Sequence, residues 1–219
     1  MRLRLLLLPA ALGIGMLPAP ASAASGGICQ LNGTAAFSPA LTNTAGNFSY
    51  SFSGALSGCQ SSDATAPTAG SVEAGKTVNV AYNWSYTDAT GTHSGTATAT
   101  YQEPVPSGSG SCGSSTTSGT AFDTWSDGTQ TVETYSTTGA AAAVNLSGSV
   151  VPSATLTLLS FTGPAQAPPA STHTVSTTRY LGDSASGLLT FQPPDPTLCG
   201  STGVTSAAIS GGVGLGSTS

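Results

Sequence analysis

Positive charge is almost absent from this sequence. Only four of its 219 residues are Lys or Arg, against nine Asp or Glu, and two of the four lie at the extreme N-terminus. Beyond residue 23 only Lys76 and Arg179 remain, so two positive and nine negative residues give that part a net charge of −7. Nucleic acids and anionic membranes are bound through clustered Lys and Arg side chains. We therefore expect no nucleic-acid partner and no binding to a membrane surface.

Catalytic and metal-binding motifs are equally scarce. The two histidines, His93 and His173, lie far apart among Ser and Thr residues, and we interpret both as solvated loop residues. No Cys-x-x-Cys or His-x-His spacing indicates a metal site. Gly182-Asp183-Ser184 lacks the full Gly-x-Ser-x-Gly pattern of an esterase nucleophile, and we interpret it as a turn between strands. We therefore expect a protein that is not an enzyme and holds no cofactor or metal.

No stretch beyond the N-terminal segment shows the 3.6-residue period of an amphipathic helix. Alternation of period two is clearest over residues 77–86, where Val78, Val80, Tyr82, Trp84 and Tyr86 share one face that we interpret as core-facing. Many short strands separated by turns are typical of sandwiches and barrels. We predict an all-β, antiparallel β-sandwich, immunoglobulin-like or jelly-roll-like, with about 9–12 short strands. Further strands are expected at residues 29–37, 47–56, 94–101, 154–161, 174–181, 186–192 and 203–210.

The strongest hairpin signal is Asp127-Gly128, which lies between two strand-like runs in the stretch from Cys112 to Val151. A third strand is expected after Gly139. Two registers remain open for the hairpin. A four-residue loop pairs Trp125 with Gln130, and a three-residue loop with a bulge at Gly128 pairs Trp125 with Thr129.

The register decides where the two acidic residues of the hairpin point. In the second register Asp123 and Glu133 are diagonal neighbours on one face, about 7–8 Å apart, whereas in the first they point to opposite faces. A glycosidase pair needs about 5–10 Å between its carboxyl groups. We prefer the simpler interpretation, two solvated strand positions. Trp125, next to the turn, is the better candidate for an exposed ring, and Trp125, Asp123 and Glu133 are the candidate ligand contacts.

Residues 1–23 have the layout of a secretory signal peptide. Arg2 and Arg4 precede an apolar run that ends at Leu17 and is too short to span a membrane, and Ala21-Ser22-Ala23 is a small-residue cleavage site. We expect cleavage after Ala23 and a secreted, extracellular protein of 196 residues. No later run is apolar enough for membrane insertion of this mature form.

Four cysteines in an exported chain indicate two disulfides, for which three connectivities exist. We predict Cys29–Cys59, because these residues bracket the first two strands and an antiparallel return brings them together. We predict Cys112–Cys199 because the first opens the second half of the chain and the second closes it. We expect one domain over residues 24–210, with a subdivision near 103–111 as the alternative, and a flexible C-terminal tail over 211–219.

A series of short landmarks runs along most of the mature chain. In order they are Phe37-Ser-Pro-Ala-Leu-Thr42, Gly54-Ala-Leu-Ser-Gly-Cys59, Trp125-Ser-Asp-Gly-Thr129, Leu181-Gly182, Gly187-Leu-Leu-Thr-Phe191 and Cys199. Their order resembles that in a group of small secreted proteins of unknown function from high-GC Gram-positive, actinobacterial bacteria. The resemblance implies a secreted β-sandwich with paired cysteines, and it implies no activity.

These observations favour an exported, non-catalytic protein with a structural or interaction role at or outside the cell surface. Its partner would be an extracellular protein or a glycan. The alternative is a carbohydrate-binding module, or a secreted hydrolase that acts through Asp123 and Glu133 or through Ser184.

Overall fold

The computed structural model describes residues 26–216, so the predicted signal peptide lies outside the described residues. Within this range no helix is long and apolar enough to cross a membrane. The all-β prediction is confirmed, and the one helical turn between residues 26 and 216 is the 3-10 helix η1 (Pro196–Gly200). The strands are β1 (Gly27–Leu41), β2 (Gly46–Ser61), β3 (Gly70–Ala74), β4 (Thr77–Asp88), β5 (Gly91–Gln102), β6 (Ser107–Gly110), β7 (Ser114–Trp125), β8 (Gln130–Ala140), β9 (Ala143–Val151), β10 (Ser153–Phe161), β11 (Thr172–Ser176), β12 (Ser184–Gln192) and β13 (Val204–Leu215).

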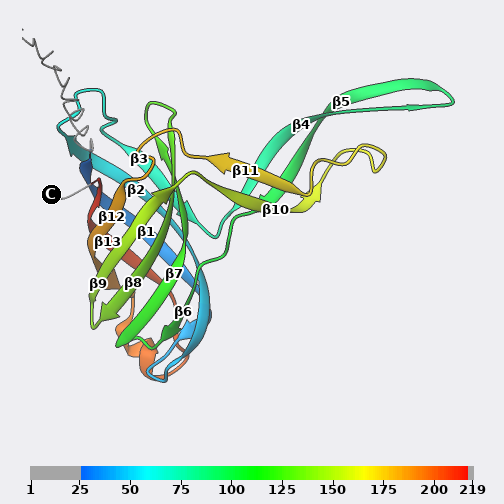
Figure 1. Ribbon diagram of the computed structural model, residues 1–219. Coiled ribbons are helices and arrows are strands. Elements are labelled where there is room, and N and C mark those ends of the chain that lie inside the picture. Colours follow the sequence, from blue (N-terminus) through cyan, green and yellow to red (C-terminus); the bar gives the residue numbers. More distant parts are fainter. Residues whose placement is uncertain (1–25, 217–219) are drawn as a thin grey trace, which may run out of the picture.

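The larger sheet closes on itself (Figure 1). Its nine strands follow the order β1-β13-β12-β9-β8-β7-β3-β2-β6, and β1 also pairs with β2. The short strands β3 and β6 both lie between β2 and β7, one after the other, so they fill a single position of an eight-stranded barrel. The predicted sandwich therefore becomes a closed barrel. Alternation of polar and apolar residues indicates one buried face in both architectures, and it does not indicate which strands close the sheet.

The chain leaves the barrel twice to build a second sheet with the order β11-β10-β5-β4. One excursion separates β3 from β6, and the other separates β9 from β12. The second sheet packs on the outer face of the barrel, where Phe122 of β7 and Val132 of β8 contact Tyr101 and Leu156 in a second hydrophobic cluster. Because β10 pairs only with the last residues of β5, the far half of the β4–β5 hairpin projects away from the barrel as a two-stranded ribbon (Figure 1).

The connector near residues 103–111 returns the chain from β5 of the second sheet to the barrel wall, and Glu103 and Pro106 are buried there. A flexible tail does not begin at Gly211. Strand β13 continues to Leu215 and pairs on one side with β1 and on the other with β12, so the barrel itself holds this segment.

Both predicted disulfides are confirmed. Cys29–Cys59 joins the beginning of β1 to the end of β2. Cys112–Cys199 joins the β6–β7 connection to η1 at the opposite end of the barrel. There the backbone N–H of Cys112 donates to Thr42, which follows β1, so the disulfide ties together the segments that close this end.

Candidate functional site

The register of the central hairpin places the two acidic residues together. The backbone N–H of Trp125 donates to the Thr129 carbonyl at 2.9 Å, which is the register with the three-residue loop. Gly128 adopts a φ of 82°, a conformation that glycine reaches without a Cβ clash. In this register Asp123 lies opposite Thr131 and Glu133 lies opposite Ala121. The two carboxylic residues are therefore diagonal neighbours on one face, and that face is the inside of the barrel.

Asp123 and Glu133 are buried, with 4% and 9% of their surface exposed. The interpretation as solvated strand positions is therefore wrong. The physical reason is closure of the sheet, which turns one face of β7 and β8 into an interior. The opposite face of these strands is also covered here, because Phe122 and Val132 pack against the second sheet.

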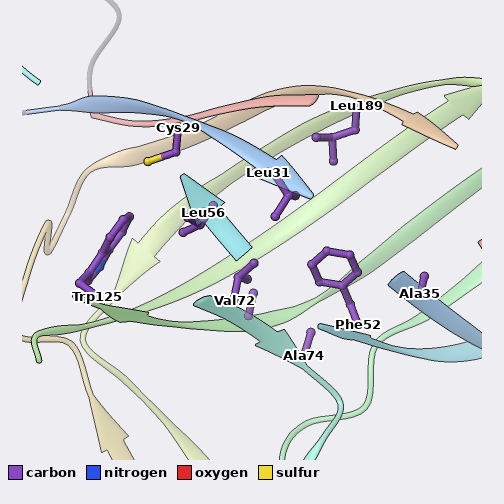
Figure 2. Close-up of a cluster of buried hydrophobic side chains, with 10 residues drawn as sticks. Cys29, Leu31, Ala35, Phe52, Leu56, Val72, Ala74, Trp125 and Leu189 are labelled. Atoms are coloured by element: carbon purple, nitrogen blue, oxygen red, sulfur yellow. The ribbon is translucent and has the colours of Figure 1, made fainter. Parts of the chain in front are cut away.

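The interior of the barrel contains a partly open cavity of about 150 Å³. Most of its wall is apolar, and the side chains of the larger hydrophobic cluster converge on this interior from several strands (Figure 2). They include Leu31 of β1, Phe52 and Leu56 of β2, Leu189 of β12 and Val213 of β13. A polar stripe runs along β7 and β8, and it includes Asp123, Glu133, Tyr135, Thr117 and Thr137. Tyr50, Gln60 and Ser61 of β2 and Ser186 of β12 add polar groups elsewhere on the wall. The cavity thus has a mostly apolar wall, and its two acidic groups lie together on the β7–β8 side.

Burial governs the ionisation of the two acidic side chains. Desolvation raises the pKa of Asp123 well above its usual range, and the neighbouring Glu133 raises it further. Desolvation raises the pKa of Glu133 to about 7. Within residues 26–216 no hydrogen bond or ion pair to either carboxyl group is found. Both groups are therefore predominantly neutral in mildly acidic solution, and both remain free to contact a molecule in the cavity.

The remaining polar groups of the stripe satisfy one another. The hydroxyl groups of Tyr50 and Tyr135 lie 2.7 Å apart, and Thr117 lies 3.1 Å from Tyr50 and 2.7 Å from Thr137. Burial raises the pKa of both tyrosines, so both stay protonated. Phe48, Tyr50 and Phe52 share the inward face of β2, as their alternation predicts. The role of Tyr50 as a partner of Tyr135 could not be inferred, because 85 residues separate them.

Trp125 closes one end of the cavity. Only 5% of its surface is exposed, so the expectation of an exposed ring is wrong. Its indole N–H donates to Thr131 at 2.8 Å, and its ring packs edge-on against Tyr180 at a centroid distance of 5.5 Å. Arg179 covers the same end through ion pairs with Asp63 at 3.3 Å and Asp127 at 3.1 Å. All three of the candidate contacts, Trp125, Asp123 and Glu133, line the cavity.

The structure does not unite the other residues considered for catalysis. Both histidines lie on strands rather than in loops. His93 of β5 stacks on Tyr86 and lies 3.2 Å from Asp88, whereas His173 of β11 packs against Tyr101. Among the described residues no group of three or more His, Cys, Asp or Glu side chains is arranged to hold a metal ion.

The tripeptide Gly182-Asp183-Ser184 forms a turn between strands, as interpreted. The Asp183 N–H donates to Tyr180 at 3.0 Å, and Gly182 has a φ of 86°. The Ser184 hydroxyl donates to the Gly216 carbonyl at 2.9 Å, which commits it to the backbone.

No protein-family model matches the chain, and no curated protein or solved structure matches it either. The site must therefore be interpreted from its own geometry.

Proposed function

We propose that this chain is an exported, non-catalytic binding protein whose barrel takes up one small, mostly apolar molecule. The observation that carries the proposal is the interior cavity, with its mostly apolar wall and a small number of polar groups. A closed barrel of eight strands is just wide enough to be filled by side chains or to hold one small ligand. Pockets for small molecules are typically apolar with a few polar groups that orient the ligand.

The size of the cavity limits the ligand. A dry, engineered cavity of about 150 Å³ lined by apolar side chains binds benzene. The interior found here has the same volume, about 150 Å³. A molecule with one ring, or a short branched chain, fits this space. Two linked sugar rings do not, which disfavours both a carbohydrate-binding module and a glycosidase that would hold its substrate inside the barrel.

Hydrolysis by Asp123 and Glu133 is the rival function, since a buried acid with a raised pKa can act as a general acid. The small volume of the interior disfavours this rival, because a glycosidic bond must lie between the two carboxyl groups with a sugar on each side. A screen of glycosides and esters separates the two. Turnover that is abolished by Asp123→Asn, Glu133→Gln or Ser184→Ala would contradict the binding proposal.

Export is proposed on two grounds. The two disulfides indicate an oxidising environment. The predicted cleavage after Ala23 would leave Ala24 as the N-terminus of the secreted form. The intact mass of the protein recovered from culture medium tests this, and a soluble form that retains residues 1–23 would contradict it.

Binding is tested with small apolar probes on the mature protein. We expect benzene or toluene to raise the melting temperature, because a ligand that binds only the folded state stabilises it by mass action. Filling the cavity with Ala121→Leu, or with Ala35→Leu where the first variant folds poorly, should abolish this shift. Thr124→Leu, at an exposed position of the same strand β7, serves as the control and should keep it. A shift that survives both filling variants, or no shift in the wild type, would contradict the proposal.

A further inference from the structure

We propose that the cavity selects a small monoamine. Its ammonium group would sit between Asp123 and Glu133, and its apolar ring or chain would lie against Leu31, Leu56 and Leu189. This inference rests on the proposed function, since it names the chemical class of the ligand held inside the barrel.

The first argument is the missing partner of two buried acids. Carboxyl groups that are removed from water are normally paired or hydrogen-bonded, because an unpaired polar group in an apolar interior is unfavourable. Here both acids line the cavity and are at least nine-tenths buried, and no partner is found among residues 26–216. Their oxygens are not among the fully buried atoms without a partner, so they face the open space of the cavity, where a ligand group can reach them. The polar groups that face the cavity beside them, Tyr50 of β2 and Tyr135 of β8, already bond to each other.

The second argument is that the chain supplies no cation to this interior. Arg179 is engaged with Asp63 and Asp127 at the end of the barrel. Lys76 lies at the base of the β4–β5 hairpin, next to Glu103. The two histidines lie on the second sheet, outside the barrel. None of the described residues therefore supplies a positive charge to Asp123 and Glu133, and a cation that pairs with their ionised forms would be a ligand.

The third argument is geometric. Diagonal neighbours on one face of an antiparallel pair lie about 7–8 Å apart, so their carboxyl groups can flank one small group. An ammonium group carries three N–H donors and no acceptor, which suits two carboxylates on opposite sides. When both carboxyl groups are ionised, an alcohol has a single O–H donor and can satisfy only one of them, and a carboxylate ligand would be repelled. Two acidic groups on one side of a mostly apolar wall fit one amine on one apolar body.

Binding of an ammonium group also moves protons. In the empty cavity at pH 6, burial keeps Asp123 and Glu133 largely protonated. A bound cation favours the carboxylate form, so protons leave these oxygens for the solvent as the ligand enters with its own proton retained. Affinity for the amine should therefore rise between about pH 5 and pH 8, whereas affinity for a neutral probe should change little over the same range.

The experiment is calorimetric titration of the mature, disulfide-intact protein with benzylamine, benzyl alcohol, toluene and benzoate. At pH 8 we expect benzylamine to bind at least about tenfold more tightly than benzyl alcohol, because hydrogen bonds to charged groups are the stronger ones. The preference should shrink at pH 5. At pH 6, titrations in two buffers of different ionisation enthalpy should show that benzylamine releases protons on binding and that the other three compounds do not.

Matched variants locate the preference. Asp123→Asn and Glu133→Gln should each reduce the preference for benzylamine over benzyl alcohol by about tenfold while toluene still binds. Glu73→Gln, an exposed acid on the neighbouring barrel strand β3, should leave the preference unchanged. If either cavity variant fails to fold, proton release by the wild type decides the question.

The outcomes separate the two proposals. Equal binding of the amine, the alcohol and toluene without proton release would overturn the amine inference and leave the apolar binding function standing. Tighter binding of benzoate than of benzylamine would overturn the inference as well. Binding of none of the four compounds would contradict the proposed function itself.

Discussion

Glu133 links the stability of the barrel to pH at the scale of a single residue. Burial raises its pKa from 4.5 to about 7, so the folded protein holds a proton that the unfolded chain has released across this interval. The contribution of Glu133 to the free energy of unfolding is therefore fully present below about pH 4.5, and it is lost as the pH rises to about 7. The shift corresponds to a loss of up to about 3 kcal/mol. Denaturant unfolding of the ligand-free protein at pH 4.5, 6 and 8 measures it.

Substitution shows which acid is responsible. Glu133→Gln should flatten much of this decline, and the remaining slope should have the same sign because burial also raises the pKa of Asp123 and of Glu103. Glu73→Gln is the control, since its side chain is exposed on β3, and it should retain the decline caused by Asp123 and Glu133 while reducing only the share of Glu103, whose pKa the charge of Glu73 raises. A wild-type stability that increases from pH 5 to pH 7 would contradict the buried, unpartnered state of the pair.

The two tryptophans should report different environments. Trp125 is buried at the end of the cavity, whereas Trp84 lies on the projecting part of the β4–β5 hairpin and is only partly covered. We expect the emission of Trp84→Phe, which retains Trp125, to be blue-shifted and protected from acrylamide. The emission of Trp125→Phe should be quenched readily. Equal quenching of the two variants would contradict the structure.

At the scale of the elements, the second sheet depends on its contact with the barrel. Leu156 of β10 is fully buried between the two, while Leu159 on the same strand is 57% exposed. We expect Leu156→Ala to lower the free energy of unfolding by about 2–5 kcal/mol, because the truncation leaves a cavity. The control Leu159→Ala should change it by about 0.5 kcal/mol or less. Similar effects of the two substitutions in denaturant unfolding would contradict the packing described for this strand.

The strands themselves were largely predictable, because their alternation is local. The face from Val78 to Tyr86 shows what alternation alone cannot predict. Val78, Val80 and Tyr82 pack against the second cluster, as a core-facing strand should, but Trp84 and Tyr86 continue the same pattern onto the projecting ribbon and stack on each other. Periodicity indicates which side chains share a face, and it does not indicate how far the neighbouring layer extends.

The candidate site was predictable only in part for a related reason. The sequence identified Asp123, Trp125 and Glu133 and reduced the hairpin to two registers. Burial of the acids followed from closure of the sheet, in which β1 near the start of the chain pairs with β13 near its end, and no local pattern encodes that pairing. Tyr135 and Tyr50 joined the site through the same closure.

At the scale of the whole molecule, the disulfides fasten the two ends of the barrel. Cys29–Cys59 closes a loop of 30 residues and Cys112–Cys199 one of 87. In the chain-entropy description, removing them should lower the free energy of unfolding by about 4 and about 5 kcal/mol respectively, because the longer loop restricts the unfolded chain more. Denaturant unfolding of the two double alanine variants tests this order.

The position of the second disulfide adds a further consequence. Cys112 and Cys199 hold together the β1–β2 turn, the β6–β7 connection and η1, which close one end of the barrel. The variant without this bridge should therefore exchange a bound toluene probe faster than the variant without Cys29–Cys59, when both are compared under conditions where each is fully folded. Exchange that is faster in the Cys29–Cys59 variant would place the route into the cavity at the opposite end, beside Trp125 and Arg179.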